Sequence, residues 1–177
     1  MRIIAGSRKG SKIFAPKGET RPTGDRVREA AFNLIGPVDD MAVLDLFAGS
    51  GAMGLEALSR GAASAVFVES DREAQRTIER NLEKLDLKGA RILKSDARRA
   101  LAAEVTAGRR YDLVLVDPPY RMLDSLLPTL AKYLPELVAE GGLVVVESSA
   151  KNQPTLPLAE RTSRKYGSAR VTLFEAS

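Results

Sequence analysis

Residues 43–54 constrain the fold of this chain more than any other stretch. They read VLDLFAGSGAMG, an apolar run of strand formers that continues directly into a glycine turn. A run without polar alternation predicts a strand buried on both faces, at the centre of a sheet covered by helices. Gly49 and Gly51 allow a sharp turn, so a ligand can approach main-chain N–H groups where a helix over residues 52–60 begins.

The glycine pattern alone does not identify the ligand. A dinucleotide-binding turn, an S-adenosylmethionine turn and a strand-to-helix corner without a ligand all fit the spacing of Gly49, Gly51 and Gly54. The next predicted strand, residues 65–69, ends in Glu69, which lies 20 residues after Gly49. A carboxylate at this position accepts hydrogen bonds from the hydroxyls of an adenosine ribose. Together the two features predict an adenosine-containing cofactor.

Composition limits both the class of protein and its chemistry. The 177 residues alternate strand and helix patterns from residue 43 onward, which predicts one α/β domain with an arm (residues 1–20) and a core (residues 21–177). The chain has no cysteine and no histidine, which excludes thiol and histidine catalysis; we expect no metal. It has no charged leader and no apolar run long enough for a membrane span, so we expect a cytoplasmic protein without a membrane partner. We also expect a monomer, although no feature of the sequence shows the oligomeric state.

The N-terminal segment is strongly basic. Residues 1–28 contain eight Lys and Arg against two acids, and they lack an amphipathic apolar face. This excess predicts a nucleic-acid partner, although a solvated basic arm would look the same. Two strand-like pieces around residues 7–10 predict a small β-hairpin with a cationic tip. The candidate RNA contacts are Arg8, Lys9, Lys12, Arg21, Arg26 and Arg28; for Arg26 and Arg28, at the start of the next helix, the sequence leaves a contact with the cofactor equally open.

Several helix boundaries can be predicted from local signals. Thr23 is the expected N-cap of an amphipathic helix that ends before residues 36–37, and Ser70 with Glu73 forms a capping box for the helix after the second strand. Residues 122–139 contain Pro128 and Pro135, which predicts helical pieces and not one straight helix.

Asp96 follows the third predicted strand, residues 90–94. A carboxylate at the carboxyl end of a parallel strand can meet the amino group of an adenine. It can equally serve as the N-cap of a helix over residues 97–107, and the sequence leaves both alternatives open.

The fourth predicted strand, residues 111–116, is followed by Asp117-Pro118-Pro119-Tyr120. Ligands bind at the carboxyl ends of strands in open α/β sheets, and two consecutive prolines project the backbone rigidly with its carbonyl groups available. Asp117 and the carbonyl of Pro118 can accept both N–H donors of an exocyclic base amine, while Tyr120 offers a stacking face. The structural alternative is an ordinary end of a strand.

The C-terminal part completes the sheet. Residues 143–147 predict a fifth strand, and residues 161–166 and 170–174 predict a hairpin around Gly167 and Ser168. The expected fold is therefore α/β with a seven-stranded, mostly parallel sheet and one antiparallel strand.

With these residues identified, the chain resembles the bacterial 16S rRNA (guanine(966)-N2)-methyltransferase family over nearly its whole length. The segments that carry the resemblance are residues 21–33 (RPTGDRVREAAFN), 45–57 (DLFAGSGAMGLEA) and 116–120 (VDPPY). The first is the most specific to the family. The other two are common to many amino methyltransferases.

The resemblance implies a Rossmann-like methyltransferase fold, S-adenosylmethionine as cofactor, and 16S rRNA or a small-subunit precursor as partner. Methyl transfer to a guanine N2 amine would need neither a metal nor a covalent enzyme intermediate. In the implied site, Asp117, Pro118 and Tyr120 hold the guanine. The implied cofactor contacts are Asp45, Gly49 and Gly51 for the methionine part with Ala48 in the same turn, Glu69 for the ribose, and Asp96 with Ala97 for the adenine.

Three other functions compete with this interpretation. An adenine-N6 methyltransferase acting on RNA or DNA uses the same tetrapeptide at residues 117–120. A nicotinamide-dependent dehydrogenase would explain the glycine turn, but not that tetrapeptide or the basic segment. A non-enzymatic RNA-binding module would not need the cofactor turn.

Overall fold

The computed structural model describes residues 1–17 and 24–177. In this part of the chain a seven-stranded sheet has the strand order β3-β2-β1-β4-β5-β7-β6. The strands are β1 (Ala42–Leu46), β2 (Ser64–Glu69), β3 (Ala90–Lys94), β4 (Tyr111–Val116), β5 (Val138–Ser149), β6 (Ala159–Tyr166) and β7 (Ala169–Glu175). The helices are α1 (Asp25–Ile35), α2 (Ala52–Ser59), α3 (Arg72–Leu85), α4 (Ala97–Thr106) and α5 (Leu123–Leu137), with a 3₁₀ turn η1 (Tyr120–Met122).

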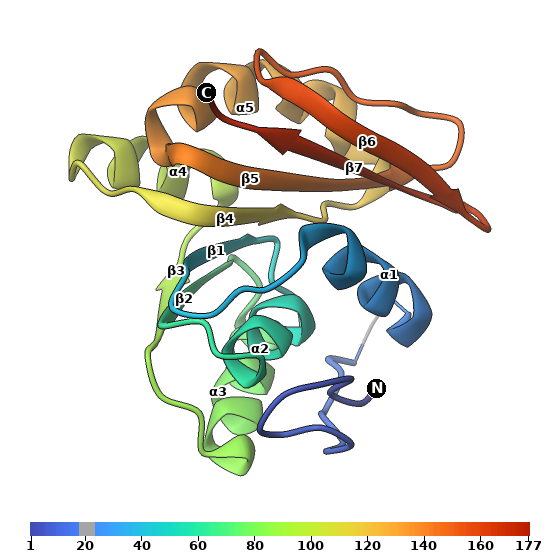
Figure 1. Ribbon diagram of the computed structural model, residues 1–177. Coiled ribbons are helices and arrows are strands. Elements are labelled where there is room, and N and C mark those ends of the chain that lie inside the picture. The colour runs from blue at the N-terminus through green and yellow to red at the C-terminus, as the bar shows by residue number, and fades with distance from the viewer. Residues whose placement is uncertain (18–23) are drawn as a thin grey trace.

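Helices cover both faces of the sheet (Figure 1). One hydrophobic cluster joins α1, α2 and α3 to one face, and a second joins α4 and α5 to the other. Strands β1 to β5 pair in parallel, whereas β7 is antiparallel to both of its neighbours, β5 and β6. The predicted α/β fold with a mostly parallel sheet and one antiparallel strand is confirmed.

The central strands are buried on both sides, as the apolar run at residues 43–46 predicted. Val43 belongs to the cluster on the α1–α3 face, while Leu44 and Leu46 belong to the cluster on the α4–α5 face. Successive side chains of a strand point to opposite faces, so one strand supplies both cores. This alternation also fixes which face each residue beyond the end of a strand will join.

The N-terminal segment forms a short version of the predicted hairpin. Residues 1–17 contain one isolated antiparallel bridge, between Arg2 and Lys12, and no strand. Ile3 and Ile13 are buried in the core. The carboxylate of Glu56, in α2, accepts hydrogen bonds from the backbone N–H groups of Ile4 (2.8 Å) and Ala5 (3.0 Å). The N–H groups of Ile3 and Ile13 also donate to carbonyl groups of the opposite arm, so both these cross-arm bonds and side chains of the core hold the short hairpin.

Two predicted N-caps were not found. Thr23 lies outside the described residues, and α1 has Gly24 as its N-cap, without a capping side chain. For α3 the N-cap is Asp71, not Ser70, and its carboxylate accepts from the N–H of Ala74 at 2.8 Å. The capping carboxylate therefore lies one residue later than the local pattern indicated.

The prediction of separate helical pieces at residues 122–139 was wrong. Helix α5 is continuous over both of its prolines, and β5 begins directly after it at Val138. Each proline removes one backbone donor, which costs helix stability. The apolar stripe of α5 compensates for this cost, because its five buried residues are fully covered by the sheet and α4: Leu123, Leu126, Leu130, Leu134 and Leu137.

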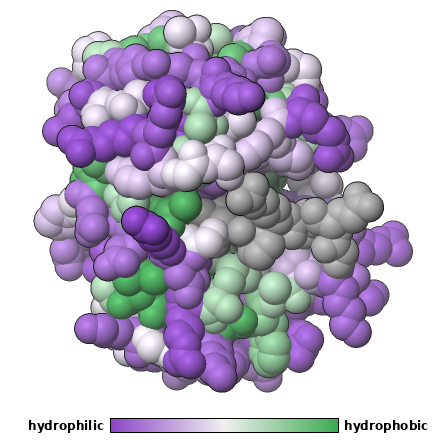
Figure 2. Space-filling model, turned by 90° about the vertical axis from the view of Figure 1, so that its right-hand side faces the viewer, coloured by the Kyte–Doolittle hydropathy of each residue, from purple (hydrophilic) through white to green (hydrophobic). Residues whose placement is uncertain are grey.

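The surface is largely polar. Hydrophilic side chains cover most of the face shown in Figure 2, with smaller apolar areas between them. Among the described residues, Phe14 is the only large hydrophobic residue that is exposed, at 38%. The cationic groups of Arg80 and Lys84 lie over its ring, 4.1 and 4.8 Å from the centroid. Within the described residues no helix has both the length and the apolar character that crossing a membrane requires.

Candidate active site

Four carboxylates line the carboxyl ends of the central strands. In each strand the acid comes two residues after a core residue of the α1–α3 face, so it points to that same face. The strands are neighbours in the order β2, β1, β4, β5, and the acids therefore form a row across the sheet. In that order the acids are Glu69, Asp45, Asp117 and Glu147.

The glycine turn begins immediately after β1. Phe47 adopts φ 60°, an unusual value for a residue with a side chain, and Gly49 and Gly51 adopt φ 58° and 84°. A Cβ atom added at Gly49 would meet no atom within 4 Å, which leaves this side of the backbone open to a ligand. At Gly54 an added Cβ would lie 2.4 Å from Cε1 of Phe67, so this glycine is required for packing of α2 on β2.

Glu69 fixes the glycine turn to the end of β2. Its Oε2 accepts from the N–H of Gly49 at 2.8 Å, and its Oε1 accepts from the N–H of Asp71 at 3.0 Å. A carboxylate accepts about four hydrogen bonds in total, so these two contacts are compatible with further bonds to a diol. The position is the one predicted for the ribose contact.

Asp45 is more deeply buried than Glu69 and is only 1% exposed. Its Oδ2 accepts from the N–H of Gly54 at 2.9 Å. Burial raises the pKa of Asp45 to about 7; the bond from Gly54 opposes this shift, and the nearby charge of Glu69 adds to it. A cationic group bound at the turn would favour the ionised carboxylate.

Asp117 and Glu147 are adjacent at the next position along the sheet. Val116 pairs with Val146 in the parallel register of β4 and β5, so the residues that follow lie side by side. Both line a narrow, mostly apolar cavity between the sheet and α1. The hydroxyl of Tyr120 donates to Oε1 of Glu147 at 3.3 Å. The structure thus brings Asp117 and Glu147 together in one cavity, with Tyr120 bonded to Glu147, and the contact of Asp117 and Tyr120 with a base stays a prediction.

Glu147 was not predicted as a site residue, although a signal was present. It ends the apolar run of residues 143–147 in the same way that Glu69 ends the second strand. The sequence did not show where this strand lies in the sheet. Only the observed order of strands shows that β5 lies next to β4.

Asp96 serves as the N-cap of α4, which was one of its two predicted roles. Its Oδ1 accepts from the N–H of Arg99 at 3.0 Å. Ala97 is the first residue of that helix and is buried. Both residues follow β3, at the same edge of the sheet as Glu69, and their contact with an adenine stays a prediction.

Two of the basic residues have roles within the fold. Arg28 is 0% exposed and forms ion pairs with Asp25 (2.9 Å) and Glu56 (3.4 Å), so its predicted contact with RNA was wrong. The guanidinium of Arg8 donates to the backbone carbonyl groups of Leu85 and Asp86 at the C-terminal end of α3. A cation there satisfies carbonyl groups that the helix leaves unpaired.

The other basic residues remain candidates for RNA contact. Lys9, Lys12 and Arg26 are exposed, and Arg21 lies outside the described residues. Lys9 follows Arg8, whose N–H donates to Oγ of Ser59 at the C-terminal end of α2. Helix α2 begins at the glycine turn, and its 8 residues correspond to a length of about 12 Å. Lys9 therefore lies at the edge of the sheet opposite the four carboxylates.

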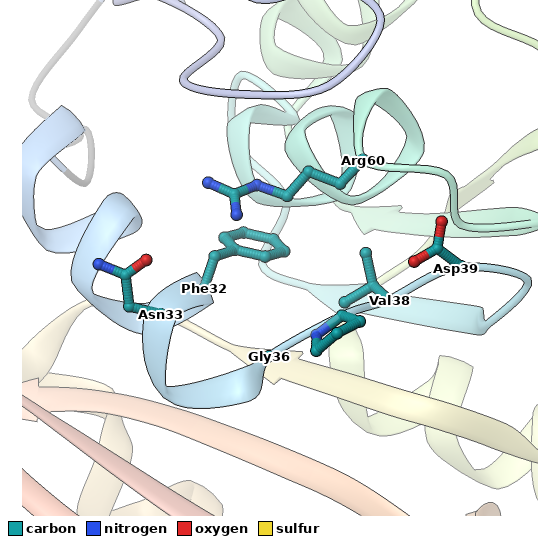
Figure 3. Close-up of a pocket in the computed structure, with 7 residues that line it drawn as sticks. Phe32, Asn33, Gly36, Val38, Asp39 and Arg60 are labelled. Carbon is teal, nitrogen blue, oxygen red and sulfur yellow. The ribbon is translucent and has the colours of Figure 1, made fainter.

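A pocket of about 330 Å³ lies at that opposite edge and is not part of the carboxylate row (Figure 3). It is lined by the C-terminal half of α1, by Val38 and Asp39 before β1, and by Arg60 after α2. The guanidinium of Arg60 lies over the ring of Phe32, 4.7 Å from its centroid. Among the described residues, no group of three or more acids is placed to hold a metal ion.

Comparisons with known proteins agree with this fold. Ribosomal RNA small subunit methyltransferase D of Escherichia coli strain K12 is 43% identical over 162 residues, which cover 89% of this chain and 79% of that protein. A hypothetical protein of Thermus thermophilus superposes with a TM-score of 0.86 at 36% identity and covers 99% of each chain.

A third comparison involves a solved structure with bound ligands. The 16S rRNA N2 G1207 methyltransferase of Thermus thermophilus, in complex with AdoMet and guanosine, superposes with a TM-score of 0.71 at 26% identity. The match covers 91% of this chain and 44% of that one. A family model described as "Conserved hypothetical protein 95" matches residues 1–175. The predicted resemblance is therefore confirmed. This chain belongs to the family that this model describes, and it is a methyltransferase.

Proposed function

We propose that this methyltransferase transfers a methyl group from S-adenosylmethionine to the exocyclic N2 amine of a guanine in 16S rRNA. The observation that carries the proposal is the position of Asp117. Its carboxylate follows β4, next to the strand that enters the glycine turn, and is itself followed by Pro118, Pro119 and Tyr120. This is where a base amine and a cofactor bound at the turn would meet.

The residues around the turn fit S-adenosylmethionine. The backbone at Gly49 is open to a ligand, and the buried Asp45 offers an acceptor for the ammonium group of the methionine part. Glu69 would accept hydrogen bonds from the ribose hydroxyls, and Asp96 with Ala97 would contact the adenine. The cofactor supplies an electrophilic methyl group on a sulfonium.

Positioning of the base amine provides most of the catalysis. Asp117 and the Pro118 carbonyl accept the two N–H groups of the amine, which aims its lone pair at the methyl group. Near-attack positioning of two bound reactants supplies about 7 to 11 kcal/mol of barrier reduction. Positive charge develops on the nitrogen during transfer, and the carboxylate of Asp117 stabilises it. The methylated amine then loses its extra proton readily, so no strong base is required.

The RNA substrate must present an unstacked base. A guanine inside a helix cannot reach this edge of the sheet, so the base has to be turned out of its stack. The ring of Tyr120 would support it, since stacking contributes roughly 1 to 3 kcal/mol per base. We place the reaction in the cytoplasm, with a monomeric enzyme acting on 16S rRNA or a small-subunit precursor that the exposed Lys9, Lys12 and Arg26 help to hold.

A methyl-transfer assay tests the proposal. Unmodified 16S rRNA and small subunits are incubated with cofactor that carries a labelled methyl group, and the nucleosides are then separated. We expect N2-methylguanosine as the labelled product. N6-methyladenosine would instead support the alternative activity on adenine, which the same tetrapeptide allows. Calorimetric titration with S-adenosylmethionine and with NAD distinguishes the methyltransferase from a dehydrogenase, since only the former should bind the methyl donor.

A further inference from the structure

We infer that Glu147 selects guanine over other purines by accepting a hydrogen bond from the N1–H of the target base. The inference rests on the proposed function and adds a residue that determines specificity. Asp117 would bind the amine that receives the methyl group, and Glu147 would bind the neighbouring ring nitrogen of the same base.

The register of β4 and β5 places the two carboxylates next to each other. Val116 pairs with Val146, and Leu115 pairs with Val145. Asp117 and Glu147 are the residues that follow this last pair, so their backbones lie about 4.8 Å apart, the spacing of neighbouring strands. Both come two residues after a core residue of the α1–α3 face, and both line the cavity under α1. The side chains thus approach a bound base from one side.

The hydrogen-bonding edge of guanine matches this pair of acceptors. Guanine offers two adjacent donors, the N1–H and the N2 amine, and both can point at carboxylate oxygens. Adenine offers its N6 amine, but its N1 carries a lone pair and no hydrogen. A carboxylate opposite that lone pair is repelled and left without a donor, which is unfavourable in a partly buried site.

Tyr120 holds the carboxylate of Glu147 in place. Its hydroxyl donates to Oε1 at 3.3 Å, so the residue that supports the base also orients the acid that would recognise it. A carboxylate accepts about four hydrogen bonds, so this contact is compatible with a bond from the base. Glu147 is only partly buried, so part of its side chain is exposed to solvent.

The test uses RNA in which the methylated guanine is replaced by 2-aminopurine. This analogue keeps the 2-amine that accepts the methyl group, but its N1 carries a lone pair in place of the hydrogen. Single-turnover rates, measured with enzyme in excess over RNA but below saturation, give kcat/KM for both substrates. We expect the wild-type protein to prefer guanine by about 10- to 100-fold, the range of one specific pair of base contacts.

Two variants separate the role of Glu147 from the other differences between the bases. Glu147→Gln carries an amide that can accept from guanine N1–H or donate to the N1 of 2-aminopurine, so the preference should fall to within a few-fold of unity. Glu140→Gln changes the same residue type at the exposed other end of β5 and should keep the wild-type preference. Thermal transitions and S-adenosylmethionine affinity should be unchanged in both.

Three results would overturn the inference. Equal rates of the wild-type protein on both bases would show that N1–H is not read, and this measurement needs no variant. An unchanged preference in Glu147→Gln would show that another group reads it. In both cases guanine methylation itself would stand. Absence of any N2 methylation of the guanine substrate would instead refute the proposed function, and the inference with it.

Discussion

Asn81, in α3, donates a hydrogen bond from its carboxamide to the backbone carbonyl of Ser50, in the glycine turn, at 3.0 Å. The same side chain exchanges two further bonds with Phe14: its Nδ2 donates to the carbonyl at 3.0 Å, and its Oδ1 accepts from the N–H at 2.8 Å. Asn81 is 0% exposed. One buried amide therefore connects the N-terminal segment to the turn that would hold the cofactor.

Replacement of Asn81 should affect stability and cofactor binding together. Asn81→Ala leaves the backbone groups of Phe14 and Ser50 without their partner; the buried carbonyl of Ser50 costs about 1 to 3 kcal/mol when unpaired, and the partly exposed groups of Phe14 cost less. We expect a lower free energy of unfolding in urea and weaker S-adenosylmethionine binding. Asn33→Ala, at an exposed position of α1, is the control and should change neither quantity. Wild-type cofactor affinity in Asn81→Ala would show that the turn does not depend on this contact.

Glu69→Ala should weaken cofactor binding and leave the fold intact. The acid lies at the end of a strand, and its loss would remove the proposed bonds to the ribose together with the bond that holds Gly49 in the turn. Hydrogen bonds to a charged group contribute about 1.5 to 3 kcal/mol, so the Kd for S-adenosylmethionine should rise about ten-fold or more. Calorimetry on Glu83→Ala, an exposed acid in α3, provides the comparison. Equal affinity in the two variants would place the ribose elsewhere.

Asp117→Ala should slow methyl transfer without unfolding the protein. Loss of one interaction that stabilises developing charge typically lowers the rate by about 10² to 10³. The measurement is single-turnover methylation at saturating RNA and cofactor, accompanied by the thermal transition. Asp124→Ala removes an exposed carboxylate from the first turn of α5 and should retain the wild-type rate. A wild-type rate for Asp117→Ala would return residues 117–119 to a purely structural role.

Asp45 should make the stability of the ligand-free protein depend on pH. Its pKa is about 7 in the folded protein and 3.8 as the unperturbed value, so the folded state binds one more proton between these values. The free energy of unfolding should therefore fall as pH rises from about 4 to 7, by up to about 1.4 kcal/mol per pH unit from this group. Urea titrations of Asp45→Asn beside the wild-type protein isolate that contribution, because the variant cannot ionise.

The same group provides a readout for binding of the cofactor's ammonium group. A cation beside Asp45 lowers its pKa, so S-adenosylmethionine binding at pH 6 should release a proton. Calorimetry in buffers of different ionisation enthalpy measures this release. Its absence in the wild-type protein, or its persistence in Asp45→Asn, would contradict the assignment.

The exposed lysines of the N-terminal segment should contribute to RNA binding. In the double variant Lys9→Ala/Lys12→Ala, the slope of log K against log salt should decrease by about 0.7 to 0.9 for each lost phosphate contact. Cofactor affinity should not change, because Lys9 lies at the opposite edge of the sheet. Lys132→Ala/Lys165→Ala has the same charge change on exposed positions of α5 and β6, and a slope equal to that of this control would show that the two lysines are merely solvated.

Local sequence patterns determined where the candidate active site of this protein lies. The apolar run before Gly49 predicted a doubly buried strand, and the acids after two such runs predicted Glu69 and Asp117 at one edge of the sheet. These predictions succeeded because the alternation of side chains in a strand fixes the face of the acid two residues after a core position. The order of strands then brings the ends together.

Only the tertiary structure decided the roles of Arg28 and Glu147 and the course of the N-terminal segment. Arg28 lies near the start of a helix, where its sequence context is that of an exposed residue. In the structure it is buried and paired with Glu56, which lies 28 residues away in the chain. Glu147 became a neighbour of Asp117 through pairing of β4 with β5, and Asn81 reached Phe14 across 67 residues. Such contacts depend on which distant groups satisfy one another's charge and hydrogen bonds once the chain is compact. No local pattern carries that information, because each partner alone has the sequence of an ordinary surface residue.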